Sequence, residues 1–250
     1  MKRDIARLQD GVYDLLVIGG GITGAGVALD AAARGWRVAL IDQGDFASAT
    51  SSASSKLIHG GLRYLEHGQF RLVSEALAER RRLLHNAPHL VWPLRFVLPF
   101  YRGGRLPRWK GRVGVWLYDR FAGSRNLASS RGLSALQLRR SFPALRSGDL
   151  LGGVEYYDAQ MDDARLCLAV IQTSFRFGAC PANYVRAFDV DCGGNTAAVS
   201  VRDEITGARF GIRARLVVNA AGPWCDAVRR LADDPSLPVL EPTKGVHLVI

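Results

Sequence analysis

The chain has 250 residues, of which 48% are hydrophobic and 22% are charged. These proportions are those of ordinary globular proteins, so they exclude a disordered or fibrous chain and leave room for one large domain or two small ones. Lysine and arginine outnumber aspartate and glutamate by 33 to 23, which gives a formal charge of +10. That surplus suits an anionic ligand, an anionic membrane surface or nucleic acid, and by itself it does not choose among them.

The cysteines and the N-terminus indicate the compartment. No C-x-x-C pair or metal-ligand cluster is formed by the four cysteines at positions 167, 180, 192 and 225, which favours a reduced, cytosolic setting. The basic residues at the N-terminus are not followed by the apolar stretch of a signal peptide. The most apolar run, residues 15–29, is rich in glycine and shorter than the roughly 20 residues of a membrane span. We therefore expect no transmembrane helix.

The N-terminal region has the pattern of a βαβ unit. Residues 14–19 are predicted to form a strand. Four consecutive aliphatic residues between Asp14 and Gly19 are typical of a parallel strand covered on both faces. An alanine-rich helix is predicted over residues 21–35, with Gly35 at its C-terminal end, and a second strand over residues 36–42. Residues 43–68 are expected to be a loop.

A further helix follows, and after it the amino-acid composition changes. Apolar residues at 3.6-residue spacing predict a helix over residues 69–86, and the run ERRR at 79–82 is interpreted as its solvated face. Between residues 88 and 152 prolines, tryptophans and arginines interleave. This segment is therefore predicted to be an inserted second unit rather than a continuation of the βαβ pattern.

The rest of the chain returns to mixed helix and strand. Asp162 and Asp163 stand where an N-cap and a first-turn acid belong, ahead of a predicted helix over residues 164–177. Three strands are predicted after it, and the last two are joined by a turn with the sequence ITGA. These strands cover residues 183–190, 197–203 and 209–222.

Three glycines stand at the junction of the first strand and the first helix. Gly19, Gly21 and Gly24 form the pattern G-x-G-x-x-G, which allows a tight turn, close approach of a pyrophosphate and close packing of helix on strand. Asp42, at the end of the second strand, is placed to accept hydrogen bonds from ribose hydroxyls. The pattern favours an adenine dinucleotide over a glycine-rich turn of another kind, and it leaves NAD and FAD open. A buried strand within residues 215–224 is expected beside the first strand.

Six motifs spread along the chain occur together: VIGGGITGAG, SSASSKLIHGGLRYLE, RLVSEALAER, YYDAQMDDARL, NAAGPW and KGVHLV. Together they resemble the FAD-dependent glycerol-3-phosphate dehydrogenases of the aerobic, quinone-linked type, from about residue 14 to the end. The second motif is the most specific, because most other flavoproteins of the wider amine-oxidase-like group lack it. The resemblance implies an α/β fold, in which a Rossmann-like FAD-binding domain of the amine and amino-acid oxidase type is interleaved with an α+β substrate domain.

The resemblance also implies a division into domains. After an N-terminal tail of residues 1–13, residues 14–86 and 153–229 would form the FAD-binding domain, and residues 87–152 and 230–250 part of the substrate domain. Such enzymes are about twice this length, and the rest of the substrate domain, the last FAD-domain strand and a C-terminal cap have no counterpart here. The chain is therefore expected to be a truncated form or fragment, and whether it is active alone is left open.

Particular residues acquire roles through the resemblance. The enzymes oxidise sn-glycerol 3-phosphate to dihydroxyacetone phosphate by hydride transfer to FAD and pass the electrons to ubiquinone or another quinone. Arg63 and Tyr64 would bind the substrate phosphate, with Lys244 as a weaker candidate. His247 matches the family's active-site histidine and is the candidate base, with a structural role as the alternative. His59 either contacts the flavin or caps a turn, and the turn is favoured.

The residues expected to bind FAD surround the glycine turn and continue into the motif SSASSKLIHGG. Its serines and lysine would contact the pyrophosphate or ribityl chain, and its paired glycines would let the backbone pass under the flavin ring. We call residues 51–61 the serine–glycine segment and expect it to run continuously from the cofactor phosphate toward the substrate phosphate. The predicted cofactor residues are Gly19, Gly21, Ile22, Thr23, Gly24, Asp42, Gln43, Ser51, Ser52, Ser55, Lys56, Leu57, Gly60, Gly61, Ala221 and Gly222.

Two other functions are alternatives. A related FAD-dependent amine or amino-acid oxidase would share the glycine pattern without needing Arg63 and Tyr64. A non-catalytic membrane-surface module rests on the +10 charge and on residues 93–121, where aromatic residues alternate with arginine and lysine. For the dehydrogenase, the same stretch predicts peripheral docking on the cytoplasmic face of the inner membrane. No nucleic-acid partner is expected, because no recognition motif is present, and the oligomeric state, a homodimer included, is open.

Overall fold

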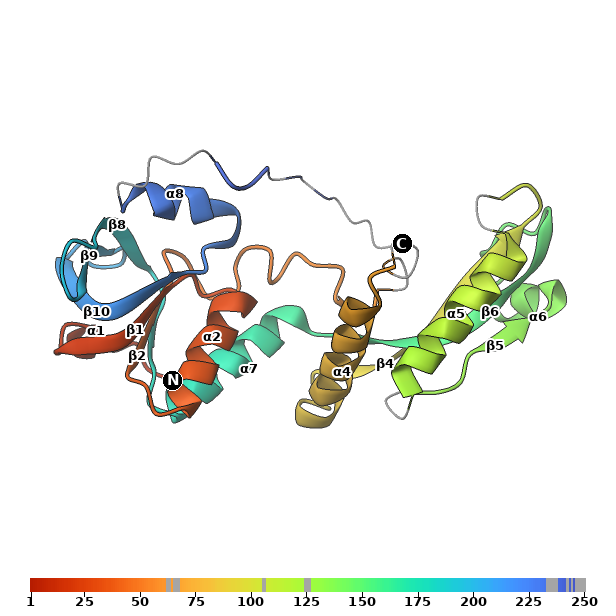
Figure 1. Ribbon diagram of the computed structural model, residues 1–250, viewed down its shortest axis with the longest axis horizontal. Helices are drawn as coiled ribbons and strands as arrows, with labels where there is room; N and C mark the ends of the chain where they lie inside the picture. Colours follow the sequence, from red (N-terminus) through yellow and green to blue (C-terminus); the bar gives the residue numbers. More distant parts are fainter. Residues whose placement is uncertain are drawn as a thin grey trace. The chain divides into compact units, whose positions relative to one another are not determined.

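The computed structural model describes residues 1–61, 64, 68–104, 107–123, 127–232, 238–241, 243 and 245. These residues belong to two units, and Figure 1 colours them along the chain. The first unit contains Met1–Ser55 and Asp163–Ile250, and the second contains Lys56–Asp162. In sequence, the second unit is therefore an insertion between the two parts of the first.

A six-stranded sheet forms the centre of the first unit, with the strand order β7-β2-β1-β10-β9-β8. The pairs β7–β2, β2–β1 and β1–β10 are parallel, and β10, β9 and β8 form an antiparallel meander. This pairing confirms that the strand ending in NAAG lies beside the first strand. The strands are β1 (Val12–Ile18), β2 (Val38–Ile41), β7 (Cys180–Ala182), β8 (Val185–Asp191), β9 (Ala197–Asp203) and β10 (Arg209–Asn219).

Both faces of this sheet are covered by apolar side chains. Leu15 and Val17 of β1 belong to a cluster with alanines of helix α2 and with Ile171 of helix α7, and the two helices lie side by side in Figure 1. Leu16 and Ile18 belong to a second cluster with residues of β9 and β10. Burial on both faces explains the unbroken aliphatic run of β1. The helices of this unit are α1 (Ile5–Leu8), α2 (Ile22–Ala33), α7 (Asp163–Arg176), η2 (Gly222–Trp224) and α8 (Cys225–Arg230).

The second unit has an antiparallel sheet with the order β3-β6-β4, and β5 also pairs with β6. Its long central strand is β6 (Leu150–Met161), flanked by β3 (Leu57–Ile58), β4 (Val91–Tyr101) and β5 (Arg131–Leu133). Its helices are α4 (Phe70–Asn86), α5 (Arg108–Ala122) and α6 (Ala135–Ser141). Val73 and Leu77 of α4 and Tyr118 of α5 share a buried apolar cluster.

The elements predicted from the sequence are confirmed, with small shifts at their ends. Gly35 has the positive φ of +85° that is typical of the residue after a helix end, and helix α7 begins at Asp163 as the acidic pair indicated. The expected loop over residues 43–68 contains the short strand β3. Within the predicted inserted unit, the structure has helix α5.

One interpretation of a charge run is wrong. In ERRR, Glu79, Arg81 and Arg82 are exposed, whereas the side chain of Arg80 is fully buried against Asp158. The reason is the helical spacing: Arg80 lies three residues after Leu77 and seven after Val73, on the buried face of α4. A buried carboxylate partner on β6 allows an arginine to occupy that apolar face.

The unit boundaries differ from the predicted domain boundaries. Residues 56–86 and 153–162 are assigned by resemblance to the FAD-binding domain, and the structure packs them with the second unit. The functional assignment of these residues stays a prediction. Across the part of the chain that the structure describes, no helix is both long and apolar enough to span a membrane.

Candidate functional site

The glycine turn lies between β1 and α2 and is closely packed at its first and third glycines. Gly19 has a φ of +116°, and a Cβ atom at this position would lie 2.4 Å from the carbonyl oxygen of Ala220. A Cβ atom at Gly24 would lie 1.9 Å from the carbonyl oxygen of Gly19. Both contacts are with backbone atoms, so neither is relieved by a rotamer change. The first and third glycines of the pattern are therefore required by the packing of α2 against β1 and the end of β10.

The N-terminus of α2 is open. Gly21 is its N-cap and makes no side-chain cap, and Ile22 and Thr23 after it are exposed. Ser51 contributes one contact, because its Oγ accepts the N–H of Ile22 at 2.9 Å. Free N–H groups and the helix dipole favour an anion at this position. The serine–glycine segment thus reaches the helix N-terminus through Ser51, and the predicted contact of Ser51 with the cofactor stays a prediction.

Asp42 ties the end of β2 to the glycine turn. Its Oδ2 accepts the N–H of Gly20 at 2.6 Å, and its Oδ1 accepts the N–H of Gly44 at 2.8 Å. The half-buried carboxylate therefore has a structural role that sequence reasoning did not assign. Each oxygen retains a lone pair for a further donor, and its contact with a ribose stays a prediction. Gln43, next to it, is exposed.

Two buried side chains that were not predicted from the sequence pack against Gly20 in the glycine turn. A Cβ atom at Gly20 would lie 2.4 Å from the Phe46 ring, and the Cys167 thiol lies 3.6 Å from the carbonyl oxygen of Gly20 as a weak donor. Burial and the nearby Asp42 carboxylate raise the pKa of Cys167 to about 11. The thiol therefore stays protonated at neutral pH and has the character of a packing residue.

The residues after β10 close the other side of the turn. The N–H of Ala220 donates to the carbonyl oxygen of Ile18 at 2.8 Å, which continues the parallel pairing of β1 and β10. The N–H of Ala221 donates to Asn219 Oδ1 at 3.2 Å, and Gly222 has a φ of +54°. Ala221 and Gly222, two predicted cofactor residues, thus lie beside the glycine turn.

The serine–glycine segment is divided between the two units. Ser51, Ser52 and Ser55 belong to the first unit, whereas Lys56 and the residues after it belong to the second. The Ser52 hydroxyl donates to the carbonyl oxygen of Ala49 at 3.0 Å and so stabilises its own turn, and Ser55 is exposed. The predicted continuity of this segment from one phosphate to the other therefore stays a prediction.

In the second unit, the segment is attached to β6. The carbonyl oxygen of Lys56 accepts the N–H of Met161 at 2.9 Å, and Leu57 is in register with Gln160. Gly60 is buried, and its N–H donates to the hydroxyl of Tyr118 at 2.7 Å. The part of the segment that carries the paired glycines is thus fixed within the second unit.

The predicted substrate residues are only partly described. Tyr64 is described and has an exposed fraction of 38%, and its N–H donates to the carbonyl oxygen of Gly61 at 2.7 Å. Gly61 has a φ of +70°, and a Cβ atom there would lie 2.1 Å from the Tyr64 ring. His59 is exposed. Arg63, Lys244 and His247 lie outside the described residues.

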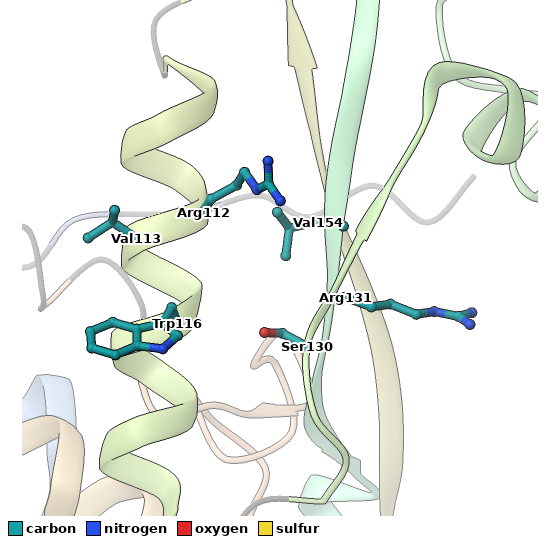
Figure 2. Close-up of a pocket in the computed structure, with 7 residues that line it drawn as sticks. Arg112, Val113, Trp116, Ser130, Arg131 and Val154 are labelled. Atoms are coloured by element: carbon teal, nitrogen blue, oxygen red, sulfur yellow. The ribbon is translucent and has the colours of Figure 1, made fainter.

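A separate pocket lies on the second unit between α5 and strands β5 and β6 (Figure 2). Its volume is ≈ 360 Å³. Arg112 extends from α5 toward the strands, whereas Arg131 points away from the pocket and pairs with Glu155 at 2.9 Å. The described lining residues include none of the predicted cofactor residues; they are Arg112, Val113, Trp116, Ser130, Arg131, Gly132 and Val154.

The turn, the open helix end and the carboxylate at the end of β2 define a dinucleotide-binding protein of the Rossmann-like class. The FAD dependent oxidoreductase family matches residues 14–250. The chain belongs to this family, which confirms the predicted fold class and resolves the choice left open between NAD and FAD.

Several proteins with similar sequences are named glycerol-3-phosphate dehydrogenase. The chain is 44% identical to the mitochondrial glycerol-3-phosphate dehydrogenase of Rattus norvegicus, over 95% of this chain and 34% of that protein. It is 41% identical to the aerobic glycerol-3-phosphate dehydrogenase of Staphylococcus haemolyticus, over 100% of this chain and 46% of that protein. The chain therefore spans between a third and a half of the length of these relatives, which confirms that it corresponds to only part of them.

Solved structures show the same fold. The glycerol-3-phosphate dehydrogenase of Bacillus halodurans complexed with FAD matches with a TM-score of 0.70 and 34% identity, over 91% of this chain and 38% of that chain. The glycine oxidase of Geobacillus kaustophilus matches with a TM-score of 0.56 and 21% identity, over 87% and 57% of the two chains. The second likeness concerns the fold alone.

Proposed function

We propose that this chain provides the FAD-binding part and a portion of the substrate site of a dehydrogenase that oxidises sn-glycerol 3-phosphate to dihydroxyacetone phosphate. The observation that carries the proposal is the closed glycine turn beside an open helix N-terminus, in a chain 44% identical to proteins named for this activity. Ubiquinone or another quinone is the proposed electron acceptor.

The residues of the first unit fit FAD. The turn at Gly19 and Gly24 leaves space only for backbone, and N–H groups at the N-terminus of α2 would face the pyrophosphate of bound FAD. Asp42 has a free lone pair on each oxygen for the ribose hydroxyls. When bound, FAD supplies the two-electron acceptor for oxidation of an alcohol. The chain's own residues orient the cofactor and the substrate.

The substrate contacts form the second part of the proposal. Arg63 would hold the substrate phosphate through a bidentate pair, because a planar guanidinium matches two phosphate oxygens. Tyr64 would donate a hydrogen bond to the same phosphate, and Lys244 would add a positive charge. His247 would accept the proton of the substrate's C2 hydroxyl, a task suited to a group with an ordinary pKa of about 6.5.

The decisive experiment is anaerobic reduction of the flavin by candidate substrates. The complete gene product, loaded with FAD, should lose its flavin absorbance near ~450 nm when glycerol 3-phosphate is added, and it should keep it with sarcosine or D-alanine. Arg63→Ala should raise the half-saturating glycerol 3-phosphate concentration at least about tenfold, because a charge-assisted pair with the phosphate is lost.

Arg71→Ala is the matched control for this substitution. Arg71 is a nearby arginine whose side chain is 93% exposed and pairs with Glu75 on α4, so its loss should leave the half-saturating concentration unchanged. Bleaching by an amine but not by glycerol 3-phosphate would replace the dehydrogenase with the amine or amino-acid oxidase alternative.

We also propose that α5 docks the protein on an anionic membrane surface, where a quinone would be reached. Trp109, Val113 and Trp116 lie on one face of this helix, at positions i, i+4 and i+7, with exposed fractions of 65%, 47% and 61%. The exposed cations Arg108, Lys110, Arg112 and Arg120 belong to the same helix. Aromatic side chains at headgroup depth with cations beside them suit a helix in the plane of the interface.

A vesicle-binding measurement tests this surface. The double variant Trp109→Ser and Trp116→Ser should bind vesicles of phosphatidylglycerol and phosphatidylcholine at least about tenfold more weakly than the unchanged protein. Trp36→Ser is the control, because Trp36 is a 46% exposed tryptophan on the first unit. Equal binding by all three proteins would refute docking through α5, and equal binding to pure phosphatidylcholine would refute its dependence on anionic lipid.

A further inference from the structure

A buried hydrogen-bond network in the second unit ends on the serine–glycine segment. Asp158 of β6 accepts three hydrogen bonds through its Oδ1: one from Arg80 Nη1 at 2.5 Å, one from the Tyr118 hydroxyl at 2.6 Å and a longer one from the Gly60 N–H at 3.4 Å. The Tyr118 oxygen in turn accepts the N–H of Gly60 at 2.7 Å. Side chains from α4, α5 and β6 therefore converge on one backbone amide.

Burying these charged and polar side chains costs desolvation free energy, which indicates that the network has a role beyond packing the core. The exposed fractions of Arg80, Tyr118 and Asp158 are 0%, 1% and 2%. A buried ion pair of this kind is often no more stabilising than apolar side chains of similar volume. Unlike apolar packing, the network is directional, because each hydrogen bond fixes the orientation of the group that makes the next one. Apolar packing at these positions would leave the Gly60 amide without this acceptor.

The hydroxyl of Tyr118 is suited to hold that amide. It donates its proton to a carboxylate, which polarises the phenol oxygen and makes it a stronger acceptor for the Gly60 N–H. Burial, and then the neighbouring Asp158 charge, raise the pKa of Tyr118 well above its ordinary value. The phenol therefore keeps its proton at neutral pH and remains the donor to Asp158.

The backbone at Gly60 lies directly against this network. A Cβ atom there would lie 2.5 Å from the Tyr118 oxygen and 2.6 Å from Leu77 Cδ2. Gly61 follows with a φ of +70°, a conformation that favours glycine. One side of this peptide is therefore occupied by protein atoms, and its N–H faces the interior of the second unit.

We propose that Arg80, Tyr118 and Asp158 are positioning residues that hold the Gly60–Gly61 backbone where it contacts bound FAD. The inference rests on the proposed function, in which these two glycines pass close to the cofactor. It also assigns the Gly60 N–H to the protein interior. The contact of Gly60 with the cofactor is then made by its Cα and carbonyl group rather than by its amide.

Tyr118→Phe is the direct test, because it removes one hydroxyl and keeps the ring. In the FAD-loaded complete protein, amide hydrogen exchange at Gly60 should accelerate on the order of tenfold, as expected for the loss of one buried hydrogen bond. The FAD dissociation constant, measured by flavin fluorescence, should rise about fivefold to tenfold for the same reason. Neither measurement depends on turnover.

Tyr156→Phe is the matched control. Tyr156 is the neighbouring tyrosine on β6, its ring packs edge-on against that of Tyr118 at 6.0 Å, and the Gly60 N–H is not directed to it. Its substitution should change neither exchange at Gly60 nor FAD affinity by more than about twofold. Unchanged exchange and affinity in Tyr118→Phe, with equal loss of thermal stability in both variants, would overturn the positioning role and leave a purely structural one.

The two proposals fail in different ways. If glycerol 3-phosphate does not reduce the flavin of the unchanged protein while Tyr118→Phe still alters exchange and FAD affinity, the proposed substrate is wrong and the positioning role holds. If the unchanged protein is reduced by glycerol 3-phosphate and Tyr118→Phe behaves as Tyr156→Phe does, the positioning role is wrong and the substrate holds.

Discussion

Gly24→Ala is expected to abolish FAD binding and to lower the midpoint of thermal unfolding. The added methyl group would lie 1.9 Å from the carbonyl oxygen of Gly19 and 3.2 Å from the Ala220 side chain. Because the nearest atom is backbone, the overlap is relieved only if α2 moves away from β1, at a cost of about 1–3 kcal/mol or more. That movement would also displace the N–H groups that face the pyrophosphate. Flavin content after purification and thermal unfolding followed by circular dichroism measure the two effects.

The same helix offers a matched control at Gly26. A methyl group there would meet no described atom within 4 Å, and alanine is favoured over glycine inside a helix by about 0.5–1 kcal/mol. Gly26→Ala should therefore raise the unfolding midpoint slightly and leave flavin content unchanged. Flavin content of Gly24→Ala equal to that of Gly26→Ala would contradict the requirement for close packing at the turn.

The first unit was largely predictable from local sequence, because its signals are local. An aliphatic run without alternation indicated that β1 is buried on both faces, and the glycine pattern marked where α2 begins. Alternating residues and a turn at 205–208 indicated the hairpin of β9 and β10, which the structure confirms. Each of these features depends on residues within one element or on one short connection.

Long-range pairing could not be predicted in the same way. Strand β3 consists of Leu57 and Ile58. It forms by antiparallel pairing with β6, which lies about one hundred residues later in the chain. A strand of two residues has no periodicity to detect. The buried position of Arg80 was accessible from the spacing of Val73 and Leu77, but the charge of its neighbours in ERRR outweighed that signal. Its partner Asp158 carries no local sign of burial.

The candidate site shows the same distinction. The residues at the glycine turn are brought together by β1, β2, α2 and the end of β10, as the βαβ pattern indicated. The serine–glycine segment reads as one continuous stretch in the sequence, yet its serines are anchored in one unit and its glycines in the other. Proximity in sequence grouped the residues that are predicted to share a function, whereas the packing that fixes each of them depends on distant elements.

Asp158→Ala should produce the largest loss of stability in the second unit. Arg80, whose side chain is fully buried, would lose its carboxylate partner, and Tyr118 would lose the acceptor of its hydroxyl. Removing one member of a buried ion pair typically costs about 3–5 kcal/mol, because the remaining charge is left in a medium that solvates it poorly. Urea unfolding followed by tryptophan fluorescence should show this cost as a lower midpoint.

Glu75→Ala is the control on the same helix as Arg80. Glu75 pairs with Arg71, and the exposed fractions of the two side chains are 58% and 93%, so the loss of this pair should change the free energy of unfolding by less than about 0.5 kcal/mol. Adding Arg80→Met to Asp158→Ala should recover part of the lost stability, because the buried Arg80 charge that has lost its Asp158 partner is then removed as well. Equal midpoints for Asp158→Ala and Glu75→Ala would show that the Arg80 charge is solvated in the folded chain. A lower midpoint without recovery in the double variant would assign the loss to Tyr118 and the Gly60 amide instead of to the ion pair.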